Sequence, residues 1–472
     1  MYIQLKKQFK KVDIFLFLAF IGGLIPAFFL IHIAAVDFSG FYFQAISFLE
    51  YKGPAYQIIM SYCDNPINTG VNSRAPVVPL LMALSMSLFD KTLLGVYIPF
   101  FLAKILILPL TYLVAKHYLP KRFAFFCALL LLFIPKLQTY SFAALEADLF
   151  IALFYCLALY FYLKSDHLSR KKYLIASTIA LSLGALTKST GFTIALGFIA
   201  AIIFENIKLI NSKQFIKNLY IYSLVFIILV GPYLLWTTAV HHQLYLSTHK
   251  DKSISYILTN LPSLIETIPL YLGISFLGGI KAKLIALILL LFLILGIIKS
   301  VLNKWFVLTL PTLATIILIS TLSTCLIGGN IPASLEFITI LGFSMIPTSI
   351  LLFIGIHSLK NKIPLIFIYL ITLLIVYKFI NNYFTSPYTL EYIPSEYYIS
   401  IPTIIKNRQD LPDVTFKTVG NLRIFQGPIV HREIKEQFTN YRFKPFSSLY
   451  KKIIYTYVFL SLIAIFFVRS EK

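Results

Sequence analysis

Long apolar runs separated by short basic stretches constrain the fold of this chain more than any other feature. Hydrophobic residues fill 58% of the 472 positions, charged residues fill 13%, and the mean hydropathy is +0.83. A single soluble core cannot bury that much apolar surface, whereas a helix of roughly 20 apolar residues crosses a bilayer. The sequence therefore predicts an all-α polytopic membrane protein.

The runs predict about twelve transmembrane helices, because most of them approach the length that a bilayer requires. The expected helices lie near residues 12–36, 93–115, 123–135, 148–163, 174–187, 191–204, 219–240, 284–299, 305–322, 337–356, 363–380 and 453–468. Basic residues precede the first run, and an excess of lysine and arginine marks the cytoplasmic side of membrane proteins. We therefore expect the N-terminus in the cytoplasm, on the evidence of Lys6, Lys7, Lys10 and Lys11.

The short apolar segment 76–89 decides how the rest of the chain is oriented. It reads PVVPLLMALSMSLF and opens with two closely spaced prolines. If it crossed the membrane, the basic clusters at 116–122 and 164–172 would lie outside. If it lies in the outer interface, these clusters and the later ones fall in the cytoplasm, as the positive-inside rule requires. We adopt the second arrangement, in which Lys281 and Lys283 are the clear exception.

This orientation leaves the longer connecting segments outside the cytoplasm, so we expect the chemistry there. They are 37–92, 136–147, 241–283 and 381–452. The last contains alternating stretches, VTFKTVG and RIFQGPIV, and the polar stretch HREIKEQF, which together predict a small extracytoplasmic α/β domain. We thus divide the chain into a transmembrane catalytic domain, 1–380, the small domain, 381–452, and a last helix with a cytoplasmic tail, 453–472.

The first outer loop, 37–92, begins with an aspartate at the membrane edge followed by an aromatic segment. The stretch from Asp37 reads DFSGFYFQAISFLEYKGPAY. Aromatic side chains gather at membrane interfaces, and this pattern favours amphipathic helices lying flat there. Such a surface suits a substrate that is itself half lipid. The alternative for Asp37 is a solvated residue at the end of a helix.

The net charge of +22 has a simple explanation in this setting. The basic residues fall in short clusters between apolar runs, where they orient the helices and meet anionic headgroups. We therefore expect membrane lipids as partners and no nucleic acid.

Four motifs follow one another in an order that resembles the GT-C glycosyltransferase superfamily. They are D-x4-Y-x2-A-x3-LE-x2-G-x2-Y from Asp37, the basic-x-Pro step SRAPVVPLL, the acidic helix start ALEADLF, and GALTKSTGF between two short helices. The aminoarabinose transferase and protein O-mannosyltransferase types look most similar, over roughly residues 1–240. The resemblance implies a GT-C-like bundle that transfers a sugar from a polyprenyl-phosphate carrier, with inversion, on the outer face of the membrane. The acceptor would be a hydroxyl or phosphate of lipid A, a glycan or a protein.

The resemblance also assigns roles to residues of this chain. Asp37 would act as the catalytic base or orient the acceptor. Arg74, at the basic-x-Pro step, would bind the lipid phosphate, which suits a planar guanidinium, and Tyr42 would line the donor pocket. Lys188 would face the same phosphate, since a lysine within a membrane segment is costly to keep; a lysine that only snorkels to the interface is the alternative.

An acid and a histidine of the outer segments complete the predicted site. The family places a functional acid where Glu146 and Asp148 stand, and the sequence leaves open which of them aligns. Glu146 is preferred, because Asp148 can serve simply as a first-turn acid that the helix dipole favours. His241 is a candidate substrate-binding residue in the loop after the seventh span. The aminoarabinose type carries a glutamate associated with a metal at the position where this chain has Ser73. A divalent metal is the only cofactor considered, and without that glutamate its presence is left open.

A lipid-linked-sugar transporter or flippase is the main alternative function. It would share the aromatic interfaces and the buried lysines, but it predicts broken helices paired in two halves. A polysaccharide polymerase or ligase is a further alternative, with arginines in a large late loop. The charges of this chain gather near the outer face of its first half instead, which favours the transferase. We expect a multi-pass protein of a bacterial inner membrane with its active site on the periplasmic face.

Overall fold

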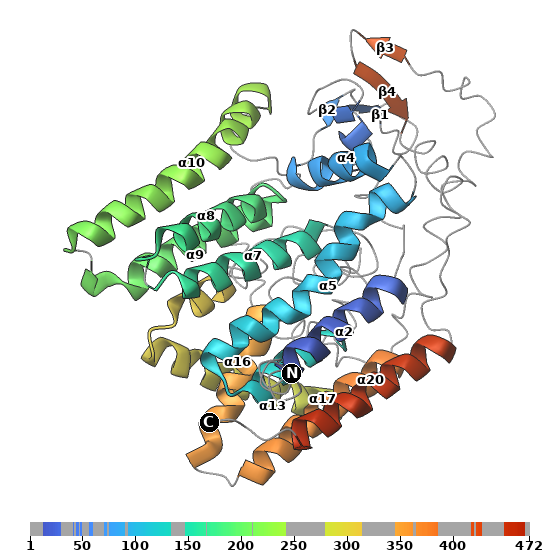
Figure 1. The fold of residues 1–472 in the computed structure, drawn as a ribbon, viewed down its shortest axis with the longest axis vertical. Helices are drawn as coiled ribbons and strands as arrows, with labels where there is room; N and C mark the ends of the chain where they lie inside the picture. The colour runs from blue at the N-terminus through green and yellow to red at the C-terminus, as the bar shows by residue number, and fades with distance from the viewer. Residues whose placement is uncertain are drawn as a thin grey trace, which may run out of the picture.

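The computed structural model describes residues 13–29, 41, 44–46, 48–49, 56–59, 70–72, 75–89, 93–133, 147–166, 168–209, 211–241, 279–313, 345–361, 365–385, 417–419, 422–426 and 448–467. Most of these residues are helical (Figure 1). The α-helices are α2 (Ile14–Phe29), α4 (Val77–Phe89), α5 (Leu93–Tyr118), α6 (Lys121–Leu131), α7 (Ala147–Lys164), α8 (Lys171–Ala185), α9 (Ser189–Glu205), α10 (Lys213–His241), α13 (Gly279–Leu302), α16 (Met345–Ser358), α17 (Leu365–Thr385) and α20 (Ser448–Phe467). Two short 3-10 helices, Ile207–Leu209 and Leu359–Asn361, follow α9 and α16.

The protein is an integral membrane protein, as the sequence predicts. Within the described ranges, three helices are long and apolar enough to cross a membrane: Leu94–Tyr118, Ala147–Lys164 and Lys213–Ala239. Of the predicted run 305–322, the structure describes residues 305–313, and residues 306–313 are helical. The described parts of the other predicted runs are mostly helical as well. Their helices are shorter or less apolar, so the total of about twelve spans stays a prediction.

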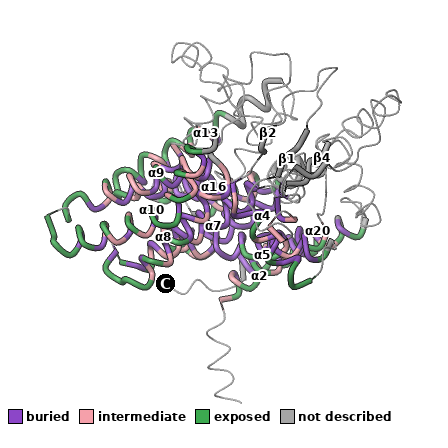
Figure 2. Tube along the Cα trace, turned by 90° about the horizontal axis from the view of Figure 1, so that it is seen from above, coloured by how far each residue is buried: buried purple, intermediate pink, exposed green. Residues whose placement is uncertain are grey.

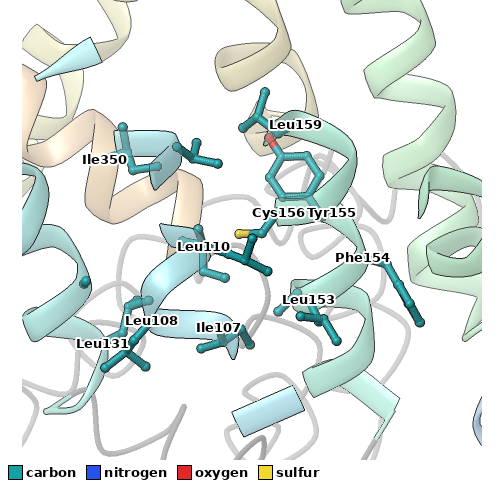
Figure 3. Packing of buried hydrophobic residues seen from close by; sticks show 14 of the residues in the cluster. Ile107, Leu108, Leu110, Leu131, Leu153, Phe154, Tyr155, Cys156, Leu159 and Ile350 are labelled. Carbon is teal, nitrogen blue, oxygen red and sulfur yellow. The ribbon is translucent and has the colours of Figure 1, made fainter. Parts of the chain in front are cut away.

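Helix α7 lies at the centre of the bundle. Figure 2 shows it buried along most of its length, whereas α10 is exposed on much of its surface. Helix α7 packs mainly against α8 and α5, and α6 packs against α5 and α16. Figure 3 shows Leu110, Cys156 and Ile350 among the buried side chains of this core. Cys127 and Cys156 are both buried free thiols. This packing fixes where each end of α7 lies.

The predicted cytoplasmic turns gather at one end of the bundle. Asn218 Nδ2 donates to the carbonyl oxygen of Leu168 at 2.8 Å, which joins the start of α10 to the turn between α7 and α8. The rings of Tyr118, at the end of α5, and Trp305, after α13, lie 5.0 Å apart. We call this end, with its lysines and arginines, the basic end.

Helix α4 lies at the opposite end, which we call the α4 end, and Figures 1 and 2 both place it beside the strands. It has 13 residues and is therefore about 20 Å long, too short for the roughly 30 Å hydrocarbon core. Val78 and Met82 are buried, whereas Leu80, Leu84 and Leu88 form an exposed apolar row. This agrees with a helix that lies in the interface.

A small sheet, which the sequence did not predict for the first outer loop, joins that loop to the late outer segment. Strands β1 (Tyr56–Ile59) and β2 (Gly70–Asn72) pair antiparallel, β1 pairs parallel with β4 (Leu422–Gln426), and β4 pairs antiparallel with β3 (Lys417–Val419). The order is β2-β1-β4-β3. The sequence predicts interfacial helices in the first outer loop, 37–92. In the structure, residues 41, 44–46 and 48–49 of this loop are helical. An independent α/β domain over 381–452 stays a prediction.

Candidate functional site at the α4 end

The site begins at the first turn of α7. Asp148 is the acidic residue of that turn, and its side chain is fully buried. A carboxylate there is favoured by the helix dipole. Full burial, however, removes its hydration, and this cost is tolerable only where a cation or hydrogen-bond donors replace the water.

Lys188 provides the cation. Helix α8 ends at Ala185 and α9 begins at Ser189, so Lys188 stands in the short turn between them with an extended backbone. Its Nζ lies 3.3 Å from Oδ2 of Asp148, and its side chain keeps 27% of its surface exposed. The Asp148 carboxylate thus pairs with the ammonium of a lysine whose side chain is only partly buried.

Close packing between α8 and α9 holds the turn that carries Lys188. A Cβ added to Gly191 would overlap the carbonyl group of Gly184 and lie 3.5 Å from Cγ1 of Ile151. Only a glycine at 191 lets α9 approach α8 and α7 this closely. Gly191 thus sets the position of Lys188 one turn away. It stands inside the predicted TKSTG motif, but we attached no role to it from the sequence alone.

The basic-x-Pro step leads into the same turn. The backbone N–H of Val77, the first residue of α4, donates to the carbonyl oxygen of Leu186 at 3.2 Å. Leu186 is two residues from Lys188, and Val77 is three residues from Arg74. The structure therefore brings together residues of three segments that the sequence presents separately: 75–77, 147–149 and 186–191. A contact between main-chain groups has no signature in the sequence.

The other predicted site residues are placed less fully. Asp37, Tyr42, Arg74 and Glu146 lie outside the described residues. His241 is the last residue of α10, and the structure describes only the backbone of this residue. Of the predicted side chains, the structure thus shows Asp148 and Lys188, and it shows them in contact. The ion pair joins these two side chains, and their roles in a reaction stay predictions.

The divalent metal that the sequence leaves open stays a prediction. Within the described ranges, no three histidine, cysteine, aspartate or glutamate side chains come together. The cation beside Oδ2 of Asp148 is the ammonium of Lys188. We derive no step through a metal.

A family model covers this site. The model of the dolichyl-phosphate-mannose-protein mannosyltransferases matches residues 73–236, about a third of the chain. The match begins just before Arg74 and includes α4, α7 and the turn at Lys188. The comparison with curated protein sequences gave no match.

Several solved membrane-protein structures resemble the chain. The oligosaccharyltransferase of Archaeoglobus fulgidus, solved with Zn and sulfate, superposes with a TM-score of 0.52 at 15% identity, over 83% of this chain and 56% of the other. The structure of the archaeal oligosaccharyltransferase AglB from Archaeoglobus fulgidus, in complex with an inhibitory peptide and a dolichol-phosphate, gives 0.51 at 14% identity, over 92% and 60%. ArnT from Cupriavidus metallidurans gives 0.47 at 13% identity, over 74% and 60%. The chain thus spans 56–60% of the length of these structures.

Together, these findings show the fold of the chain. The described helices have the fold of the GT-C membrane glycosyltransferases, which confirms the resemblance predicted from the sequence.

Proposed function

We propose that this protein is an integral-membrane glycosyltransferase that moves a sugar from a polyprenyl-phosphate carrier to an acceptor hydroxyl or phosphate. The observation that carries the proposal is the meeting of three predicted motifs at the α4 end, through the Asp148–Lys188 ion pair and the Val77–Leu186 hydrogen bond. The acceptor class, whether lipid A, a glycan or a protein, stays open.

Lys188 and Arg74 are the residues we assign to the donor phosphate. When the bond between the anomeric carbon and the phosphate oxygen breaks, the carrier changes from a phosphodiester with one negative charge to a phosphomonoester that gains a second. Cations that face this oxygen stabilise the transition state more than the bound donor, and this difference accelerates the reaction. The partial exposure of the Lys188 side chain supports this assignment.

Asp148 orients Lys188 in this proposal. An ammonium held on one side by a buried carboxylate is kept in one direction before the donor arrives, so less of its freedom is lost on binding. Glu146 stands two residues earlier and remains the candidate for contact with the acceptor or donor, and His241 and Tyr42 remain candidates for substrate binding.

Asp37 is the proposed catalytic base. The acceptor oxygen attacks the anomeric carbon from the side opposite the phosphate, its proton passes to the Asp37 carboxylate, and the polyprenyl phosphate leaves. This displacement inverts the anomeric centre. A carboxylate at the membrane edge is partly desolvated, which favours its protonated form and makes it a stronger base.

The likeness to AglB supports a lipid-phosphate donor, since that protein has been solved with a dolichol-phosphate. The positive-inside rule supports the orientation, because it places the basic end in the cytoplasm and the α4 end outside. In a bacterium, this would be the periplasmic face of the inner membrane.

Mass spectra of the envelope test the proposal. Surface glycolipids, glycans and glycoproteins are compared between wild type, a deletion strain and an Asp37→Asn strain. We expect the deletion and Asp37→Asn to lose the same single-sugar mass increment, which also identifies the sugar. If the deletion changes the glycans while Asp37→Asn behaves as wild type, Asp37 is structural and a flippase becomes the better explanation.

A further inference from the structure

Helix α9 begins beside the Asp148–Lys188 ion pair, and its N-terminus has no side-chain cap. Lys188 is the N-cap residue, and a lysine side chain offers no acceptor to the N–H groups of a first turn. The N–H of Phe192 donates to the carbonyl oxygen of Lys188 at 3.3 Å. The N–H groups of the two residues before Phe192 have no backbone acceptor in the described part of the chain. The start of α9 therefore presents unused donors next to the ion pair.

The second residue of α9, Thr190, adds a side-chain hydroxyl to these donors. Its side chain is buried, with 3% of the residue exposed, and no described group forms a hydrogen bond with its Oγ1. A buried hydroxyl without a partner destabilises a protein, so its presence calls for an explanation. Thr187 shows the ordinary arrangement three residues earlier, because its hydroxyl donates to the carbonyl oxygen of Leu183 at 2.7 Å.

Thr190 lies on the buried side of α9, which is turned toward the interior of the bundle. The same side carries Phe198, whose ring lies 5.9 Å from the ring of Tyr155 in α7. It also carries Gly191, where a Cβ would lie 3.5 Å from Cγ1 of Ile151 in α7. The Cα–Cβ bonds of a helix tilt toward its N-terminus. The Thr190 side chain therefore leans toward the first turn of α9, where the unused N–H groups are.

The ion pair alone is a poor binding site for an anion. The charges of Asp148 and Lys188 cancel, so a phosphate that approaches Lys188 also meets a carboxylate. A helix N-terminus carries about half a positive charge, and its unpaired N–H groups are a ready site for phosphate. A hydroxyl that donates to a charged oxygen adds a further contact. The start of α9 thus supplies the positive potential that the ion pair lacks.

We propose that the first turn of α9 binds oxygens of the donor phosphate through the Thr190 hydroxyl and the N–H groups of Thr190 and Gly191, alongside Lys188. This inference rests on the proposed function and adds Thr190 to it as a binding residue. The donors described here recognise phosphate oxygens and do not contact the sugar, so the ligand they take is a phosphate group carried on a lipid.

The test compares Thr190→Val with a matched control, Thr187→Val, whose hydroxyl is already paired within its own helix. Binding of undecaprenyl phosphate to the purified protein is measured together with thermal unfolding of the ligand-free protein. We expect Thr190→Val to weaken binding by about 10- to 100-fold, the range for a hydrogen bond to a charged group. Its unfolding temperature should stay the same or rise, because valine removes an unpaired buried group. Thr187→Val and Thr190→Ser should both bind as wild type does.

Two results would overturn the inference. Equal binding by wild type and Thr190→Val would show that the hydroxyl does not meet the phosphate. A lower unfolding temperature of ligand-free Thr190→Val, with a matching loss of binding, would show that the hydroxyl serves the fold instead.

Two further probes separate the sources of phosphate. We expect inorganic phosphate to compete with undecaprenyl phosphate, and to do so more weakly in Thr190→Val. Phosphatidylglycerol that binds as tightly, with the same dependence on Thr190, would overturn the assignment to the donor and indicate a site for lipid headgroups. A wild type that binds no undecaprenyl phosphate would refute the proposed function itself. Stabilisation by inorganic phosphate against thermal unfolding would then still decide whether the start of α9 holds an anion.

Discussion

Lys188 Nζ and Asp148 Oδ2 lie 3.3 Å apart, although 40 residues separate them in the sequence. The carboxylate is fully buried and the lysine is partly exposed. The two residues come from different helix ends, and their meeting turns two separate sequence motifs into one site. The consequences of this pairing can be measured.

Replacing Lys188 with methionine should destabilise the protein and abolish donor use. It leaves the buried Asp148 carboxylate without its ammonium, at a cost of about 2–3 kcal/mol; fully buried pairs cost roughly 3–5, and the exposure of Lys188 reduces this. Thermal unfolding in detergent measures the first effect, and the sugar increment measures the second.

The double variant Asp148→Asn/Lys188→Met serves as the control for that pairing. If the ion pair is real, the double variant should be less destabilised than the sum of the two single variants, because the second change removes a group that the first left uncompensated. Strictly additive losses would show that the two side chains do not interact.

A methyl group on Gly191 should disturb the site from a distance. Gly191→Ala forces α9 away from the Gly184 carbonyl and should cost about 1–3 kcal/mol, as overpacking does, together with most of the activity. The control is Gly184→Ala, where the new Cβ would meet Phe154 Cβ at 3.4 Å, an ordinary distance. Similar losses in both variants would argue against a special role for the approach at Gly191.

The hydrogen bond from Val77 can be deleted without removing a side-chain function. Val77→Pro removes the N–H, while proline at the first position of a helix is otherwise well tolerated. We expect a loss of about 1 kcal/mol in unfolding free energy and a weaker donor interaction, because α4 no longer holds the turn at Leu186. Val77→Ala keeps the N–H and should retain the activity. If proline behaves like alanine, the bond does not couple α4 to the site.

The Asp13 carboxyl makes the stability of the protein depend on pH without involving the site. Burial alone would raise the pKa of this carboxyl, but hydrogen bonds from Lys116 and Tyr112 and the charges of Lys116 and Lys121 outweigh it, so the pKa lies below its ordinary value. A depressed pKa stabilises the fold above the unfolded-state value of about 3.9, and this stability is lost as the pH falls through the folded-state pKa.

Asp13→Asn should therefore lower the thermal stability at neutral pH by about 1 kcal/mol, a small cost because Lys116 is partly exposed and screened. The difference between wild type and variant should shrink below about pH 4. A difference that stays constant over this range would contradict the assignment. Product formation should be unchanged at neutral pH.

The positions of the helices were predictable because apolar length and basic clusters depend on local sequence alone. The expected helix near 148–163 is α7, and the expected interfacial segment 76–89 is α4. The turn before Lys188 was also expected, since LTKSTG interrupts an apolar stretch. These features follow from hydropathy and charge, and predicting them does not require knowing which distant residues come into contact.

The contacts that build the site were not predictable in the same way. Nothing in the sequence around Asp148 identifies Lys188 as its partner, and the sequence argument preferred Glu146. The bond from Val77 joins main-chain groups, which every residue other than proline possesses. The pairing of β1 with β4 joins segments more than 350 residues apart, and single-strand patterns do not encode which strands meet.

Binding of a polyprenyl phosphate by the purified protein tests the central claim most directly. Undecaprenyl phosphate is titrated against wild type, Lys188→Met and, as a control at the basic end, Lys116→Met. A charge-assisted contact to phosphate is worth about 1.5–3 kcal/mol, so we predict that Lys188→Met weakens binding by about 10- to 100-fold and that Lys116→Met binds as wild type does. Equal binding by wild type and Lys188→Met would contradict the account, because the ammonium beside Asp148 would then not serve the donor phosphate.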